Sequence, residues 1–98
     1  MLQSRLYKGV DMDYYIKEQE MLIEKQKRVR KEIVNQYINA RKEKKMTQEE
    51  LSERMNVKRP NISRFESGEY NPTVDMLVKM AECLEMDLVI ELKTSKED

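Results

Sequence analysis

Histidine and tryptophan are absent from this 98-residue chain, and cysteine occurs once, at Cys83. Without histidine, the chain lacks both the most common metal ligand and the most common general base of enzymes. A single cysteine forms no disulfide within the chain and provides no multi-cysteine metal site. These absences predict a protein that is not an enzyme and that holds neither a metal nor another cofactor.

Long apolar runs are missing as well. No stretch approaches the roughly 18–20 apolar residues that a membrane-spanning helix needs, and residues 1–7 lack the apolar core of a signal peptide. A lone cysteine fits the reducing cytoplasm, where disulfides are rare. We therefore expect a cytoplasmic protein with no membrane partner.

Glycine and proline occur only twice each, at Gly9, Gly68, Pro60 and Pro72. Because these residues interrupt secondary structure most strongly, their scarcity favours helices. Apolar residues also recur at helical spacing until the C-terminal end of the chain. The sequence therefore predicts a mainly α fold, a bundle of short helices with a long N-terminal helical extension.

The charges balance in number but not in position. Lys and Arg total 19, as do Asp and Glu, so the formal net charge is zero. Residues 1–46 nevertheless carry an excess of basic side chains and residues 47–98 an excess of acidic ones. Within the acidic half, residues 54–64 contain no acid, and a local patch of this kind determines the field at a binding face. Its basic members are Arg54, Lys58, Arg59 and Arg64.

The first long segment, residues 11–44, follows a loose lead-in and contains no helix breaker. Apolar side chains recur there in steps of seven or four, which keeps them on one helical face, and either Asp11 or Asp13 could cap the start. The middle, residues 24–28, is wholly polar. One long helix and two helices both fit, and we favour a break or bend between residues 25 and 31. The apolar positions are Tyr15, Leu22, Val29, Ile33 and Tyr37.

Short helices with recognisable boundaries follow. Thr47 and Glu50 form a capping box, in which the threonine accepts from the third helical amide and the glutamate reaches back. This helix ends near Asn56, a residue that tolerates the left-handed conformation. A second short helix covers residues 59–67, and a third begins after the turn at residues 71–73.

The spacing of the apolar residues changes from a helical to an alternating pattern at the end of the chain. Between residues 87 and 93, Leu88, Ile90 and Leu92 alternate with other side chains, which is the pattern of a β-strand. The chain offers no second strand, so the simplest cover for this edge is the same strand of another copy, antiparallel across a two-fold axis. A frayed extension and a last helical turn are the alternatives.

Two short helices joined by a three-residue connection form the helix-turn-helix pattern. Residues 46–57 (MTQEELSERMNV), 62–68 (ISRFESG) and 71–73 (NPT) carry it. Over about residues 33–86 the chain resembles the XRE/Cro-type repressor domain, with the cap, the turn and the Asn-Pro-Thr at the family's spacing. The resemblance implies a homodimer that binds a palindromic operator in double-stranded DNA.

In such domains the second helix lies in the major groove, where side chains near its N-terminus reach base edges. Arginine can form two hydrogen bonds with guanine, and asparagine can form two with adenine. Each good pair favours the correct base over the others by about 1–3 kcal/mol. The resemblance to phage repressors adds Gln48, the first residue of the preceding helix, to the base-contacting residues. The expected base-contacting residues are Gln48, Arg59, Asn61, Ser63 and Arg64.

Residues that flank the groove suit phosphate contacts, which position the protein without specifying sequence. The alternative interpretations are structural: a solvated charged face for Arg59 and Arg64, local packing for Ser63, and a simple turn for residues 70–71. The expected phosphate-contacting residues are Thr47, Lys58, Tyr70 and Asn71.

The resemblance also assigns a structural ion pair to Arg41 and Glu66, which would orient the first helix against the recognition helix. One position departs from the family: Lys58 stands where a Ser or Thr cap is usual. Because a residue before proline disfavours the helical conformation, the helix could begin at Pro60 itself. The direction of Arg59 is therefore less constrained than that of Arg64.

A terminal strand in place of a fifth helix resembles HigA- and HipB-like antitoxins. The resemblance implies a bacterial toxin–antitoxin module, whose antitoxin neutralises a small basic RelE- or HigB-like toxin and represses its own operon. Tyrosine-rich amphipathic surfaces suit partner docking, although this segment could instead pack on its own domain or its twin. The expected toxin-binding residues are Tyr14, Tyr15, Ile16, Met21, Leu22 and Ile23.

The expected organisation is therefore a toxin-binding extension at residues 1–30, a helix-turn-helix domain at 31–86 and a dimerising strand with a tail at 87–98. The leading function is antitoxin and autorepressor. The alternatives are a stand-alone XRE-family repressor without a toxin partner, and an interaction adaptor that does not read DNA.

Overall fold

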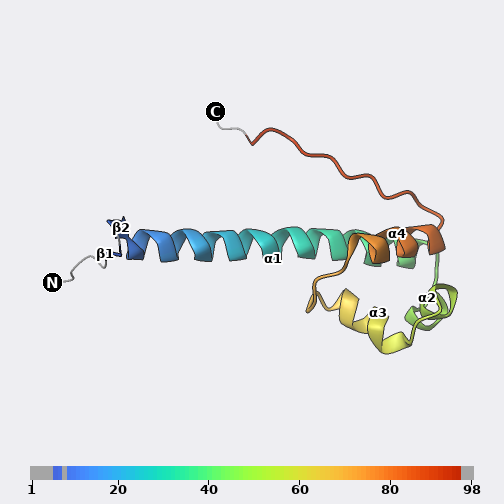
Figure 1. The fold of residues 1–98 in the computed structure, drawn as a ribbon. Helices are drawn as coiled ribbons and strands as arrows, with labels where there is room; N and C mark the ends of the chain where they lie inside the picture. Colours follow the sequence, from blue (N-terminus) through green and yellow to red (C-terminus); the bar gives the residue numbers. More distant parts are fainter. Residues whose placement is uncertain (1–5, 8, 96–98) are drawn as a thin grey trace. The chain divides into compact units, whose positions relative to one another are not determined.

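A computed structural model describes residues 6–7 and 9–95 of the chain. The chain divides into two compact units, one up to Ile33 and the other from Val34 onward. In the described residues, no helix is both long and apolar enough to cross a membrane. The helices in this part of the chain are α1 (Met12–Glu43), α2 (Gln48–Met55), α3 (Arg59–Glu66) and α4 (Val74–Cys83) (Figure 1).

Helix α1 is continuous from Met12 to Glu43, so the expected break between residues 25 and 31 was wrong. The polar stretch at residues 24–28 consists of Glu, Lys, Gln and Arg, all of which are good helix formers, and a polar surface does not by itself interrupt a helix. Asp11 caps the start, because its Oδ1 accepts hydrogen bonds from the backbone amides of Asp13 (3.0 Å) and Tyr14 (3.3 Å).

A small hairpin precedes α1, where a loose lead-in was expected. Strands β1 (Leu6–Tyr7) and β2 (Val10–Asp11) pair antiparallel, with Leu6 opposite Asp11 and Tyr7 opposite Val10. Gly9, at φ +82°, adopts the left-handed conformation that the reversal needs. Residues 1–5 of the expected extension lie outside the described residues.

The hydrophobic core of the second unit joins the C-terminal part of α1 to α2, α3 and α4. Phe65 lies in it fully buried, and its ring meets that of Tyr37 edge to face, with the centroids 5.5 Å apart. The hydroxyl of Tyr37 donates to the backbone oxygen of Leu77 at 2.8 Å, so this buried polar group is satisfied. The other core residues are Val34, Ala40, Met46, Leu51, Met55, Ile62, Leu77, Met80, Ala81 and Leu84.

The C-terminal dimerising strand is the main correction to the expected fold class. The segment after α4 contains no strand as far as residue 95, and Ile90 and Leu92 are exposed. A strand needs a neighbour to pair its backbone groups, and none of residues 6–7 and 9–95 pairs with this segment. Alternating apolar residues indicate an extended backbone, but they do not provide the partner for the hydrogen bonds of a strand. The described chain is thus mainly helical, with one two-stranded hairpin near its N-terminus.

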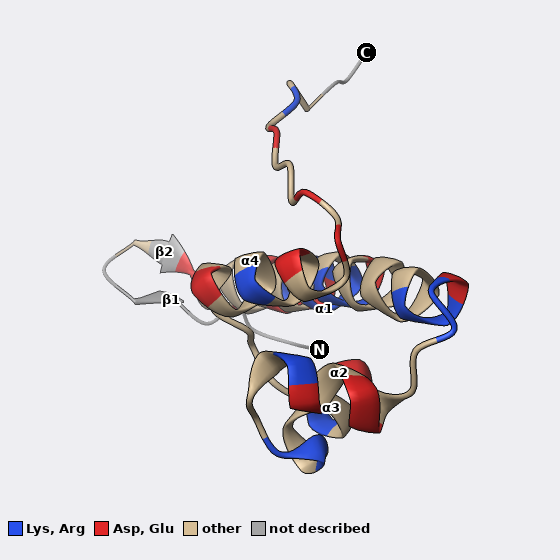
Figure 2. Ribbon diagram, turned by 90° about the vertical axis from the view of Figure 1, so that its right-hand side faces the viewer, with Lys and Arg blue, Asp and Glu red and all other residues tan. Residues whose placement is uncertain are grey.

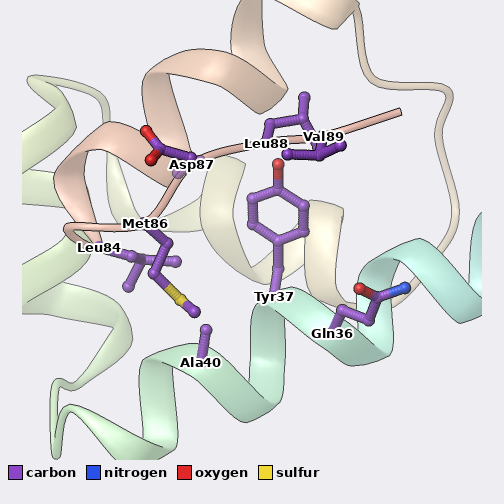
Figure 3. Close-up of a pocket in the computed structure, with 9 residues that line it drawn as sticks. Gln36, Tyr37, Ala40, Leu84, Met86, Asp87, Leu88 and Val89 are labelled. Atoms are coloured by element: carbon purple, nitrogen blue, oxygen red, sulfur yellow. The ribbon is translucent and has the colours of Figure 1, made fainter. Parts of the chain in front are cut away.

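The start of the C-terminal segment packs against the helices even though it forms no strand. Leu88 is half-buried there, and the segment forms one wall of a pocket of about 270 Å³. In Figure 3 the side chain of Tyr37 points toward Leu88 and Val89. The remaining lining comes from α1, from Ala81 of α4 and from residues that follow α4. These residues are Gln36 and Ala40 of α1, and Leu84, Met86 and Asp87 after α4.

Candidate nucleic-acid interface

Helices α2 and α3 are joined by a tight connection, and α2 has a defined cap at each of its ends. At the start of α2, Thr47 Oγ1 accepts from the Glu50 amide (3.0 Å) and Glu50 Oε1 accepts from the Thr47 amide (2.8 Å). The helix ends at Asn56, which has φ +58°, and the Val57 amide then donates to Ser52 O at 2.9 Å. This arrangement is a left-handed C-terminal cap, and it turns the chain directly into α3.

The start of α3 lacks a side-chain cap. Lys58 has the extended conformation of an N-cap residue, but its side chain makes no capping hydrogen bond. Pro60 lies in the first turn, where its missing amide costs nothing. The helix is assigned from Arg59, the start of the expected range 59–67, and not from the alternative start at Pro60, so the residue before proline is helical in spite of its usual preference.

Helix α3 has two distinct faces. Ile62 and Phe65 are fully buried, and they hold the helix against the core. Arg59, Ser63 and Arg64 are exposed, so the expected base-contacting side chains of this helix emerge together on the opposite face. Asn61 lies at the margin, half-buried. Figure 2 marks basic positions along α3, whereas acidic positions predominate on α2.

A buried hydrogen-bond network fixes how α3 sits against the rest of the second unit. Arg41 Nε and Nη2 donate to the two carboxylate oxygens of Glu66 at 2.6 and 3.0 Å, while Arg41 Nη1 donates to the Met46 backbone oxygen at 2.7 Å. Gln48 Nε2 donates to Glu66 Oε1 at 2.8 Å. Because both charged side chains are about one-tenth exposed, the guanidinium and the carboxylate satisfy each other away from water.

The contact with Glu66 orients the Gln48 amide. Since Nε2 donates inward, the amide oxygen and the second N–H of Gln48 remain for an outside partner. The residue lies at the first position of α2 and is half-buried. Sequence reasoning placed Gln48 at the interface, but it missed the Met46 carbonyl, a backbone group for which no sequence signal exists.

Two of the expected base-contacting residues touch each other. Arg64 Nη1 donates to Asn61 Oδ1 at 3.3 Å, one turn apart on α3. Asn61 Oδ1 therefore already accepts one hydrogen bond, and its second lone pair and its amide N–H groups remain for the two-point contact with adenine expected from the sequence. The i,i+3 spacing of an arginine and an asparagine was the signal for this link, and sequence reasoning did not use it.

The expected phosphate-contacting residues are not equally available. Lys58 and Asn71 are exposed, and so is Thr47, although its oxygen already caps α2. The hydroxyl of Tyr70 donates to Met76 Sδ at 2.8 Å. Burial raises the pKa of Tyr70, and the positive charge of Arg64 opposes that rise, which places the ring within the field of the basic face.

All the expected toxin-binding residues lie on α1, in the first unit, but the helical spacing places Tyr14 and Met21 on one side and Tyr15, Ile16, Leu22 and Ile23 on the other. All of them are exposed, from 37% for Ile16 to 65% for Met21. A hydrogen bond to Glu18 raises the pKa of Tyr14, so that hydroxyl already has a partner.

Comparison with known proteins identifies the second unit. The family model HTH_3, described as Helix-turn-helix, matches residues 38–90. This range runs from the C-terminal part of α1 through α4 into the segment beyond it. No match was found among curated proteins or among solved structures.

Proposed function

Because this chain belongs to the helix-turn-helix family HTH_3, whose domain indicates sequence-specific DNA binding and transcription regulation, we propose that it is a repressor that reads an operator with α3. The observation that carries the proposal is the two-faced character of this helix. Its buried face is fixed by Ile62, Phe65 and the Arg41–Glu66 pair, while its opposite face presents Arg59, Ser63 and Arg64.

The polar and charged side chains of this surface contact either bases or phosphates in this proposal. The guanidinium groups of Arg59 and Arg64 enter the major groove, where an arginine suits guanine O6 and N7. From the start of α2, Gln48 offers its amide oxygen and the N–H that does not bind Glu66. Lys58 and the residues flanking the groove bind phosphates, and those contacts make affinity depend on salt.

We further propose an oligomeric state and a cellular location for this repressor. A homodimer would present two copies of α3 to the half-sites of a palindromic operator, whose symmetry mirrors that of the protein. We place this regulator in the cytoplasm, where the DNA of a bacterial cell is accessible, and we assign it no catalytic activity and no cofactor.

Selection of duplexes from a random pool tests the proposal. The native chain should enrich a defined sequence, and Arg64→Glu should abolish the enrichment because the base-reading face then repels DNA. Lys79→Glu is the matched control, since Lys79 is an exposed lysine on α4, outside α2 and α3. Failure of the native chain to enrich any sequence would support an adaptor that does not read DNA. An unchanged consensus with Arg64→Glu would place the reading face elsewhere.

A second candidate function is that of an antitoxin which also represses its own operon. The exposure of four apolar and aromatic side chains on one side of α1 supports it, because such a surface suits a protein partner. These residues are Tyr15, Ile16, Leu22 and Ile23. Coexpression with the product of an adjacent toxin-sized reading frame provides the test. Copurification of the two products would favour the antitoxin, and the lack of such a neighbour or complex would favour the stand-alone repressor.

A further inference from the structure

The first half of α1 carries one continuous uncharged stripe. Successive residues of an α-helix are about 100° apart, so positions separated by three, four or seven residues share a face. On this basis every charged residue between positions 12 and 29 lies outside the stripe. The α1 stripe consists of Met12, Tyr15, Ile16, Gln19, Leu22, Ile23, Gln26 and Val29.

The large apolar members of the α1 stripe are exposed to solvent. Tyr15, Leu22 and Ile23 are each about half exposed, and Val29 is 44% exposed. Removing apolar surface from water stabilises an assembly by roughly 25 cal/mol per Å². An uncovered face of this length therefore favours association with a complementary helix.

We propose that the α1 stripe pairs with the same stripe of a second copy, and that the two helices run antiparallel. The stripe has the spacing of a coiled coil, in which two sets of positions repeat every seven residues and are offset by three. Met12, Gln19 and Gln26 form one set, and Tyr15, Leu22 and Val29 form the other.

Full overlap of residues 12–29 fixes the register. In an antiparallel pair, members of one set lie beside members of the other, so Met12 meets Val29 of the second copy and Gln19 meets Leu22. The same register places the amide of Gln26 beside the hydroxyl of Tyr15, and two such polar groups can satisfy each other. No layer of this register pairs two charged side chains.

The residues flanking the stripe select the antiparallel direction. On one flank, Glu18 meets Lys25 of the second copy, and symmetry forms this pair twice. On the other flank, Ile16 meets Ile23 of the second copy, also twice. A parallel pair would instead set Glu18 against Ile23 and Lys25 against Arg30, an unfavourable contact between like charges.

The pairing explains why α1 begins long before the helix-turn-helix domain. A helix whose face lies uncovered gains little from tertiary packing, which supplies most helical stability in proteins. A second copy would supply that packing and would give the protein the two-fold symmetry of an inverted repeat in DNA.

Sedimentation equilibrium of the full chain over a concentration series, without DNA, tests the pairing. The native chain should pass from monomer to dimer as its concentration rises. Leu22→Asn should remove the dimer, whereas Met21→Asn should leave the dissociation constant unchanged, because Met21 lies opposite the stripe although it is more exposed. Circular dichroism and cooperative urea unfolding of both variants establish that residues 34–98 remain folded.

Charge exchange tests the direction. Lys25→Glu should weaken the antiparallel dimer several-fold at low salt, since it sets the introduced carboxylate against Glu18 twice, and adding Glu18→Lys should restore it. A tighter dimer with Lys25→Glu would show parallel pairing and overturn the proposal. A native chain that stays monomeric would overturn the proposal as well, whether or not it binds the neighbouring gene product. Equal weakening of the dimer by Leu22→Asn and Met21→Asn would also overturn it. Because no DNA is present, these outcomes leave the repressor proposal standing.

Discussion

Arg41 and Glu66 are joined by two hydrogen bonds, Nε to Oε2 at 2.6 Å and Nη2 to Oε1 at 3.0 Å, between the end of α1 and the end of α3. Since the guanidinium also binds the Met46 carbonyl and the carboxylate also binds Gln48, the pair links α1, α3 and the start of α2. Together with the buried side chains of Ile62 and Phe65, this ion pair fixes the orientation of the recognition helix.

Removal of one partner from this pair should be costly. Glu66→Ala leaves the Arg41 guanidinium buried without its counter-charge, and breaking a buried pair typically destabilises a protein by about 3–5 kcal/mol. Urea unfolding should show a loss of this order, whereas Glu69→Ala, which removes an exposed carboxylate, should change stability by less than about 0.5 kcal/mol. Equal effects of the two substitutions would mean that the pair contributes little.

Arg64 and Lys58 should differ in how they affect DNA binding. Arg64→Ala should relax base preference at one operator position, with a loss of about 1–3 kcal/mol on the preferred sequence, whereas Lys58→Ala should weaken all sequences alike and flatten the salt dependence. Fluorescence anisotropy with operator and mismatched duplexes at several salt concentrations measures both effects. If Arg64→Ala preserves the base preference, the reading face has been assigned incorrectly.

The uncapped start of α3 offers a stabilising substitution. Lys58 has N-cap backbone geometry without a capping side chain, so Lys58→Ser should raise the free energy of unfolding by up to about 1 kcal/mol while it weakens DNA binding. The converse control is Thr73→Ala, which removes the Thr73 Oγ1 acceptor of the Met76 amide and should lower stability by about 1 kcal/mol. A destabilised Lys58→Ser chain would contradict this account.

Tyr37 should make the second unit sensitive to alkali. Burial raises the pKa of its hydroxyl above the unfolded value near 10, so the folded state favours the neutral phenol. The contribution of this group is complete below pH 10 and is lost as the pH rises through the folded pKa. Tyr37→Phe should therefore cost about 1 kcal/mol at neutral pH, from the lost bond to Leu77, and less as the medium becomes alkaline. Thermal unfolding across this range would measure the difference, and a constant difference would rule out the linkage.

Local signals in the sequence were sufficient to predict where the short helices begin and end. The cap at Thr47 and Glu50, the left-handed Asn56 and the turn before Thr73 each involve residues close in sequence whose chemistry admits few conformations. The expected boundaries of α2 and α3 consequently lie within a residue or two of those observed. The partnership of Arg41 with Glu66, 25 residues away, came from the family resemblance and not from any local rule.

The errors concern features that local patterns do not determine. A polar stretch between residues 24 and 28 was taken as a sign of a bend, but α1 continues through it because every residue there favours the helix. Alternation at Leu88, Ile90 and Leu92 indicated a strand, yet strand formation depends on a neighbour elsewhere in space. The hairpin at residues 6–11 is too short to leave a periodic signal.

The separation of the two faces of α3 has an evolutionary consequence. Ile62 and Phe65 anchor the helix from one side, while Arg59, Ser63 and Arg64 project from the other. A few codon changes at the projecting positions can thus retarget the protein to a new operator without disturbing its folding. Duplicated copies of such a gene could diverge quickly into regulators that ignore each other's sites.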